Sequence, residues 1–503
     1  MAGPRDRPGS SLGVEAARDH IDVDVVVVGA GAAGLYTALR ASREGARVAL
    51  VSATPLAETA SYWAQGGLAA ALAADDSPER HLQDTERAGR GAVRRSAAAV
   101  LVSEAPEHVR ELEALGVRFD ADRFGRLALG LEGGHSVRRV VHAGGSATGR
   151  RLVRELSARA VRDPTVAILE GTRVHRLWVV EGRCGGLACE DGRTVGARAV
   201  VITTGGAAAL WARTTNPPGS LGSGLSLAHQ AGAALADLEF LQFHPTAVIG
   251  VAGREGFLVT EAIRGEGATL HDRHGQRFVD ELAPRDEVAR AIHARLAATG
   301  ARSVGLDMRA IDTAAFPNVF GALRVAGLDA TRELVPVAPA AHYMMGGIVT
   351  DLQARSTVPG LYAVGESACT GLHGANRLAS NSLSECFVFG ARAARSAVHE
   401  PAAPTVDRVA LELLARTPGL PTPGWGTREA LWRWAGVERT GEGLGHLLSD
   451  PHELARLIAV GALARRETRG AHLRSDHPDR DPGLDHRHAV LDAHAPLRTE
   501  RWL

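Results

Sequence analysis

The feature that most constrains this chain is residues 24–34, where an apolar run of four valines closes on glycines at 29, 31 and 34 and leads into an alanine-rich helical pattern at 35–44. This order predicts a buried strand, a tight turn and a helix. In such a unit the glycines let the chain turn, let a pyrophosphate approach and let helix and strand pack closely, while the helix N-terminus favours phosphate charge. We therefore expect a dinucleotide site rather than a simple alanine- and glycine-rich turn. The expected phosphate-side residues are Gly29, Ala30, Gly31, Ala32, Ala33 and Gly34.

The basic residues exclude one class of chemistry, because all 57 are arginine and the chain contains no lysine. A Schiff-base lysine, and with it pyridoxal-phosphate chemistry, therefore cannot occur. The 57 acidic residues balance the arginines, which leaves no net field to attract nucleic acid or an anionic membrane. A length of 503 residues with 45% apolar side chains predicts about three domains with sizeable cores.

Cysteine usage and the N-terminal composition both favour a cytoplasmic protein. Cys184, Cys189, Cys369 and Cys386 form no CxxC pair and no zinc spacing, which predicts buried thiols in a reducing compartment and no bound metal. Residues 1–20 lack the apolar core of an export signal, and no apolar run reaches about 18 residues. Neither export nor a membrane span is therefore expected.

Two segments after the first unit extend the predicted dinucleotide site. A second strand at 47–51 ends at Ser52, where many dinucleotide folds place an acid on a ribose hydroxyl, so the pattern does not specify NAD. Residues 59–67 combine hydroxyls, two aromatics, an amide and two glycines. That mixture lets a backbone lie against a planar ring system, although an ordinary glycine turn would look similar. The candidate cofactor contacts here are Ser52, Ala60, Ser61, Tyr62, Trp63, Ala64, Gln65, Gly66 and Gly67.

The first motif and the A-Q-G-G of residues 64–67 together resemble the group of flavoproteins that contains succinate dehydrogenase, fumarate reductase and L-aspartate oxidase. Members of this group bind FAD. Those in membrane complexes carry, four positions before A-Q-G-G, a histidine that bonds covalently to the flavin, and this chain has Ala60 there. The resemblance therefore implies non-covalent FAD and the soluble oxidase branch.

By the resemblance, four later residues would contact the same flavin. The backbone at Val174 would lie on its adenine side. Glu366 would contact a ribose at the end of a strand predicted within 357–365, where open α/β sheets bind ligands. Ser382 and Leu383 would present backbone donors from a helix start.

Three motifs carry substrate residues that the resemblance implies. Glu132, in E-G-G-H-S, would lie near a substrate amino group, which a carboxylate suits; the alternative is a solvated loop acid. In F-L-Q-F-H-P, Gln242 and His244 would share one face of an extended strand, and His244 would contact a substrate carboxylate unless it is a core histidine. In T-E-A-I-R-G, Thr260 would offer a hydroxyl and Glu261 would accept from an amine or orient a cation.

Three further residues complete the predicted substrate site. Arg285 stands at a helix start in A-P-R-D and matches the group's proton-transfer residue. An arginine can transfer protons only in a dry, cationic site. The alternative is that Arg285 binds a substrate carboxylate without transferring a proton. His342 matches the group's substrate histidine, with a core histidine as the alternative. Arg377, within the most specific match at 371–383, would pair bidentately with a substrate carboxylate. The implied catalytic set is Arg285, His244, Glu132, His342 and Arg377, with Gln242, Thr260 and Glu261 binding substrate.

These segments predict an α/β fold built on a Rossmann-like FAD-binding domain at residues 20–238 and 345–403. An inserted α+β capping domain is expected at 239–344, because the composition changes near 237–245. Amphipathic runs at 428–437 and 447–464 predict a helical C-terminal domain at 404–503. The charged tail beyond Asp479 is expected to be loosely ordered.

The predicted substrate residues are rich in hydrogen-bond donors, and the chain as a whole has zero net charge. This combination suits a small dicarboxylate that is held at both ends. By the resemblance, the reaction is FAD-dependent oxidation of L-aspartate to iminoaspartate, with electrons passing to oxygen or fumarate. This would be the first step of quinolinate and NAD biosynthesis, with quinolinate synthase as a candidate partner. One alternative is a soluble fumarate reductase or succinate dehydrogenase flavoprotein. Another is a flavin-binding protein without turnover, which the replacement of two expected aspartates by Ser146 and Ser223 would allow.

Overall fold

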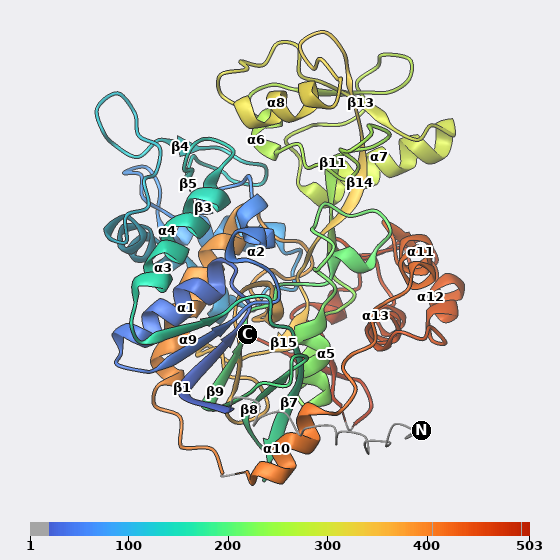
Figure 1. Cartoon of the computed structure of the whole chain (residues 1–503). Coiled ribbons are helices and arrows are strands. Elements are labelled where there is room, and N and C mark those ends of the chain that lie inside the picture. Colours follow the sequence, from blue (N-terminus) through green and yellow to red (C-terminus); the bar gives the residue numbers. More distant parts are fainter. Residues whose placement is uncertain (1–19, 405, 494) are drawn as a thin grey trace, which may run out of the picture.

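The computed structural model describes residues 20–404, 406–493 and 495–503. Residues 1–19, on which the expectation of no export signal rests in part, lie outside the described residues. The fold combines a large sheet, a smaller capping sheet and a C-terminal group of helices (Figure 1). Within the part described, none of the helices has both the length and the apolar character needed to cross a bilayer.

A seven-stranded sheet forms the base of the molecule. Its strands are β1 (His20–Val28), β2 (Val48–Val51), β6 (Val166–Leu169), β7 (Val174–Val180), β8 (Arg183–Cys189), β9 (Thr194–Ile202) and β16 (Leu361–Ala363). They are ordered β6-β2-β1-β9-β8-β7, with β16 also paired to β9. Parallel pairing joins β6 to β2, β2 to β1, β1 to β9 and β16 to β9. Antiparallel pairing joins β9 to β8 and β8 to β7.

Burial on both faces explains the unbroken valine run of β1. Val25 and Val27 face one apolar core, and Val26 and Val28 face another. The first core is covered by helices that gather on one side of the sheet (Figure 1). These helices are α1 (Ala32–Arg43), α3 (Arg95–Ala114), α4 (Thr148–Arg162) and α9 (Asn381–Ala397). The predicted first strand, turn and helix therefore form as expected.

The capping sheet lies apart from the large sheet, at the top of Figure 1. Its antiparallel strands, in order, are β11 (Leu241–Val248), β14 (Val335–Met344), β13 (Val304–Asp307) and β12 (Thr269–His271). Helices α6 (Glu261–Gly265), α7 (Arg285–Thr299) and α8 (Pro317–Val325) help enclose its own apolar core. Because β11 and β14 pair with each other, the chain enters and leaves this sheet at neighbouring strands.

The C-terminal helices pack against the core on the opposite face of the large sheet. They are α11 (Trp425–Trp434), α12 (Gly441–Leu447) and α13 (Glu453–Ala464), whereas α10 (Arg408–Ala415) contacts β7 and β8. The smaller elements are β3 (Leu68–Ala69), α2 (Pro78–Ala88), β4 (Leu129–Gly130), β5 (Val140–Val141), α5 (Ser223–Gln230), β18 (Glu438–Arg439) and β19 (Leu473–Arg474).

The expectation of a loosely ordered tail beyond Asp479 is wrong. The tail forms β20 (Arg487–Leu491) and β21 (Arg498–Arg501), which extend the sheet of β17 (Ala368–Cys369), β15 (Gly347–Val349) and β10 (Leu235–Ala236). His488 to Leu491 are buried, because β20 pairs with β10 along the sheet. This sheet joins segments assigned above to two different domains, whose limits remain predictions.

Candidate active site

The turn between β1 and α1 is shaped to admit a phosphate group. Gly29 has φ +108°, and a Cβ there would lie 2.5 Å from the Thr203 carbonyl oxygen, while a Cβ on Gly34 would lie 1.8 Å from the Gly29 oxygen. Side chains are therefore excluded at both positions. A Cβ on Gly31 would meet only Ser61 Oγ, at 3.0 Å, so Gly31 faces an open side of the turn. The first turn of α1 carries no acidic residue, which leaves its partial positive charge available to an anion.

The segment predicted to lie against a planar ring borders this turn. Ser61 Oγ accepts the backbone N–H of Ala32 at 3.0 Å, which ties the segment to the start of α1. Gln65 Nε2 donates to the Leu258 carbonyl at 2.8 Å, and Gln65 Oε1 is buried without a partner among the described residues. An orphaned buried acceptor beside an open glycine turn fits a bound flavin. The neighbouring predicted residues are Ala60, Tyr62, Trp63, Ala64, Gly66 and Gly67, of which Trp63 is exposed.

Glu366 follows β16 at the carboxyl edge of the parallel strands, near the β1–α1 turn. Its Oε1 accepts the backbone N–H of Met344 at 2.9 Å, and burial raises the pKa of Glu366 to about 7. Ser52 ends β2 at the same edge, and its carbonyl accepts the Thr172 N–H at 2.9 Å, close to Val174. Ser382 and Leu383 lie in the first turn of α9. These positions keep all five predicted residues, Glu366, Ser52, Val174, Ser382 and Leu383, as candidate cofactor contacts.

Two arginines meet at one glutamine in a buried space between β11, α7 and the segment before α9. Arg285 Nη1 and Arg377 Nη2 donate to Gln242 Oε1 at 3.1 and 3.2 Å. Arg285 Nε also donates to Glu261 Oε2 at 2.6 Å, whereas no carboxylate of the described residues pairs with Arg377. Burial and the charge of Arg285 lower the pKa of Arg377 to about 10, so it remains charged near neutrality. The pair leaves buried positive charge that an anion can neutralise.

Two histidines stand beside the arginines. The rings of His244 and His342 are 5.0 Å apart between centroids. Burial, with the charge of Arg285, lowers the pKa of both well below the usual range, so both are neutral near pH 7. His244 Nδ1 accepts the Thr246 N–H at 3.3 Å, which places its proton on Nε2. That Nε2 is buried without a partner in the described part of the chain and is therefore a donor for a ligand.

A β-bulge aims His342 at this space. The pairing of β11 with β14 steps from Gln242–Tyr343 to Phe243–Ala341, which leaves His342 as the extra residue. Bulges re-aim side chains in this way beside functional sites. The alternation predicted for Gln242 and His244 is present in β11, but the bulge could not be read from one strand alone.

Glu132 is held ionised next to the A-Q-G-G segment. Ser380 Oγ donates to Glu132 Oε2 at 2.6 Å, and His142 Nε2 lies 3.3 Å from Oε1. Burial alone would raise its pKa, but these bonds and the charge of Arg285 lower the pKa of Glu132 to about 2. A Cβ on Gly66 would lie 3.8 Å from Glu132 Oε1. The Glu132 carboxylate thus lies beside the A-Q-G-G segment, which is predicted to contact the flavin.

Ser380 is a site residue that sequence reasoning missed. It precedes α9 with φ +62°, a left-handed conformation that costs about 1–3 kcal/mol for a residue other than glycine. In that position its hydroxyl accepts the Gly67 N–H at 3.1 Å while donating to Glu132. The only available signal was its place inside the 371–383 motif.

The T-E-A segment supplies the partner of Arg285. Thr260 precedes α6 and makes no side-chain cap bond, whereas Glu261 begins α6 and contacts Arg285. Glu261 Oε1 has no hydrogen-bond partner within the described residues and lies 3.4 Å from Arg264 Nη2. Arg264, absent from the predicted set, therefore adds a third cation behind the pair.

The two serines that replace expected aspartates differ in their surroundings. Ser146 Oγ is buried and lacks a hydrogen-bond partner among the residues described. Ser223 is the first residue of α5. The replacement at position 146 therefore leaves a buried hydroxyl to which no described residue bonds.

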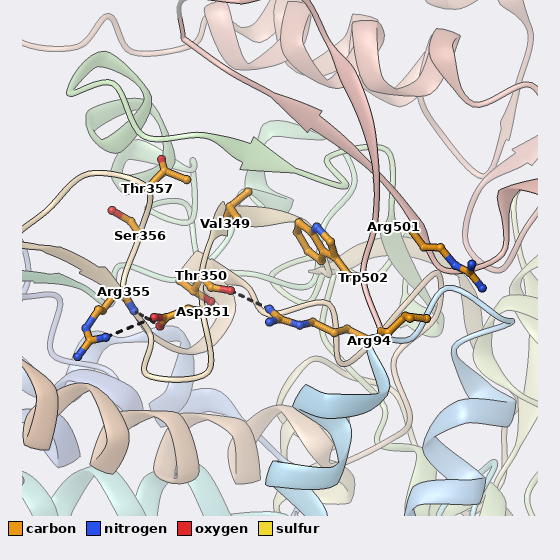
Figure 2. A pocket seen from close by; sticks show the side chains of 10 residues that line it. Arg94, Val349, Thr350, Asp351, Arg355, Ser356, Thr357, Arg501 and Trp502 are labelled. Carbon is orange, nitrogen blue, oxygen red and sulfur yellow. Dashed lines mark hydrogen bonds and ion pairs between the residues drawn. The ribbon is translucent and has the colours of Figure 1, made fainter.

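A hollow of about 480 Å³ lies elsewhere on the molecule and shares no lining residue with this site. Figure 2 shows Arg94 donating to the Thr350 carbonyl, at 3.1 Å, and an Arg355–Asp351 pair, 3.7 Å apart, on its wall. Trp502 lies between Val349 and Arg94 in the same view. The arginine pair, the histidines and Glu132 thus form a separate, enclosed centre.

The fold and the glycine turn define the class of protein, a flavoprotein of the fumarate reductase type. A family model of the FAD binding domain matches residues 24–383, and one of the fumarate reductase flavoprotein C-terminal region matches 445–498. Escherichia coli quinol fumarate reductase FrdA superposes with a TM-score of 0.86 at 28% identity over 96% of both chains. Mycobacterium smegmatis Sdh1 gives 0.83 at 30% identity over 96% of this chain and 95% of that one.

Curated relatives narrow the class to one family. The L-aspartate oxidase of Caulobacter vibrioides is 46% identical over 94% of this chain and 96% of its own length. That of Streptomyces coelicolor is 42% identical over 94% of this chain and 91% of its own length. The chain therefore belongs to the L-aspartate oxidase family.

Proposed function

We propose that this protein oxidises L-aspartate to iminoaspartate with non-covalently bound FAD. The observation that carries the proposal is the arrangement of charge. Arg285 and Arg377 share Gln242 in one buried space, and Glu132 is held as a carboxylate on its flavin side. The charge of Arg377, which no carboxylate of the described residues neutralises, suits a carboxylate of aspartate, and the anion suits its ammonium group. The relatives named L-aspartate oxidase support the same assignment.

Bound FAD supplies the acceptor for the hydride that leaves Cα. Arg377, which contacts only neutral acceptors, binds one carboxylate, and the Nε2–H of His244 is a donor for the other. Glu132 pairs with the ammonium rather than removing its proton, because a carboxyl with a pKa of about 2 is a weak base. The amine gives its proton to Arg285 as the Nε–H proton of Arg285 moves to Glu261 Oε2, to which it is bonded at 2.6 Å, so the guanidinium keeps its charge.

The proposal also covers the electron acceptor, the fate of the product and the place of the reaction in the cell. Electrons leave to oxygen or fumarate, and the structural likeness to quinol fumarate reductase supports the second acceptor. The oxidation is the first step of NAD biosynthesis, and its product, iminoaspartate, passes to quinolinate synthase. The reaction takes place in the cytoplasm, whose reducing conditions suit the four free cysteines, three of them buried and Cys386 half-buried.

Anaerobic mixing of the FAD-loaded protein with L-aspartate is expected to bleach the flavin absorbance, and mixing with succinate is not. Succinate has both carboxylates but no amine for Glu132 to pair with. Bleaching by succinate alone would assign the chain to the fumarate reductase or succinate dehydrogenase flavoproteins. Retained flavin without bleaching by either would support a flavin-binding protein without turnover.

Dicarboxylate binding is expected to change less than about threefold between about pH 6 and 8. His244 and His342 have pKa values well below 6.5, so both stay neutral across this window and keep the same donors. Glu132, with a pKa of about 2, stays ionised. The dissociation constant of succinate, followed through the flavin spectrum, checks this. A tenfold loss of affinity above pH 6.5 would mean that a charged histidine binds the ligand.

A further inference from the structure

A buried polar network behind Arg377 takes no part in the proposed reaction. The Tyr343 hydroxyl donates to Glu385 Oε2 at 3.3 Å, and His373 Nε2 lies 2.8 Å from the same oxygen. Thr370 Oγ1 donates to Glu385 Oε1 at 2.8 Å. All four side chains are buried. Because buried polar groups are costly, four that meet at one carboxylate indicate a demand for order at this place, although His373 Nδ1 has no partner among the described residues.

The network joins three pieces of chain. Tyr343 belongs to β14, Glu385 to α9, and Thr370 and His373 to the stretch between β17 and α9. Arg377 lies between His373 and Glu385, so the network holds both ends of the segment 370–385 that carries this arginine. Tyr343 adds to this network a contact from the capping sheet.

The Tyr343 ring also contacts Arg377 directly. The guanidinium carbon lies 4.4 Å from the ring centroid. Gln242, which accepts a hydrogen bond from Arg377, is the cross-strand partner of Tyr343. Paired residues of neighbouring strands share a face, so β11 and β14 together offer the guanidinium an aromatic surface and an amide acceptor. Ser382 Oγ accepts from Nη1 at 3.0 Å.

We propose that Tyr343 is the positioning residue for Arg377. Its ring fixes the plane of the guanidinium, and the bond of its hydroxyl to Glu385 adds only a weaker contact to the segment that presents Arg377. The inference rests on the proposed function in one respect, that Arg377 binds a substrate carboxylate. A planar fork pairs with two carboxylate oxygens only in one orientation, so Tyr343 sets the affinity for dicarboxylates without touching them.

A double-mutant cycle on the full-length, FAD-loaded protein tests this, with succinate as the probe and the flavin spectrum as the readout. Tyr343→Leu is expected to raise the dissociation constant about 5- to 30-fold. Tyr343→Phe keeps the ring and should stay within about threefold of the unaltered protein. In an Arg377→Lys background, which has no planar fork to orient, Tyr343→Leu should add less than about threefold. Equal losses in both backgrounds would overturn the proposal.

Tyr362→Leu is the matched control. Tyr362 is also buried, bonds to Glu400 at 2.6 Å and has no hydrogen bond to a site residue within the described part of the chain. It should lower the melting temperature without changing succinate affinity. If Tyr343→Leu also lowers the melting temperature without changing succinate affinity, the role of Tyr343 is only structural. Should that variant fail to fold, Glu385→Gln replaces it, with an expected rise of about threefold or more; unchanged affinity would overturn the proposal.

These measurements separate the two hypotheses. A protein that binds succinate but is not bleached by L-aspartate would refute the proposed function, and the cycle would still decide the role of Tyr343. A protein that binds no dicarboxylate would refute both.

Discussion

Replacing Arg285 with glutamine is expected to lower the rate of flavin reduction by L-aspartate about 10²- to 10⁴-fold, the usual contribution of a proton-transfer group. Arg285 is the side chain that connects Gln242 with Glu261, through bonds of 3.1 and 2.6 Å. Glutamine is too short and uncharged to make both contacts. FAD content should not change, because Arg285 lies on the capping sheet side of the site, at the start of α7.

Stopped-flow reduction at increasing aspartate separates the two roles considered for Arg285. A proton-transfer role lowers the limiting rate and leaves the dissociation constant nearly unchanged, whereas a carboxylate clamp raises the dissociation constant. Arg295→Gln is the control, since Arg295 lies on the same helix but is only half-buried and pairs with Asp272, 3.5 Å away. A limiting rate within about threefold of the unaltered enzyme would refute the proton-transfer role.

The parallel core of the fold was predictable because its signals are local. The valine run of β1, the three glycines and the following helix need only each other to be read. The same holds for β2, which lies within the strand predicted at 47–51. In the site, the shared face of Gln242 and His244 follows from strand geometry alone.

The features of the fold and the site that could not be predicted depend on residues distant in the chain. The bulge that aims His342 exists only because β14 pairs with β11 in a shifted register. The left-handed Ser380 has no local cause and is held between Gly67 and Glu132. The charged tail becomes a buried strand because β10, about 250 residues earlier, offers an edge. Such features arise from tertiary contacts that override local preference.

Glu132→Gln is expected to lower kcat/KM for L-aspartate about 30- to 4000-fold, the loss typical of removing one partner from a buried charge pair. The glutamine amide is nearly isosteric with the carboxylate and can still accept from Ser380, which donates to Glu132 at 2.6 Å in the unaltered protein. The loss would therefore be due to the missing charge rather than to a change of shape. Steady-state turnover with aspartate measures it. Retained flavin, read from the visible spectrum, confirms an intact site.

Succinate supplies the internal control, because it lacks the amine that Glu132 is proposed to meet. Its affinity should stay within about threefold, or rise, when the carboxylate at 132 is removed, since two like charges no longer share the site. Ser380→Ala, which keeps the carboxylate but removes its hydroxyl donor, should lose less aspartate activity than Glu132→Gln. Equal losses of aspartate and succinate affinity would show that Glu132 supports the architecture of the site, and the preference for an amino acid would then have to come from elsewhere in it.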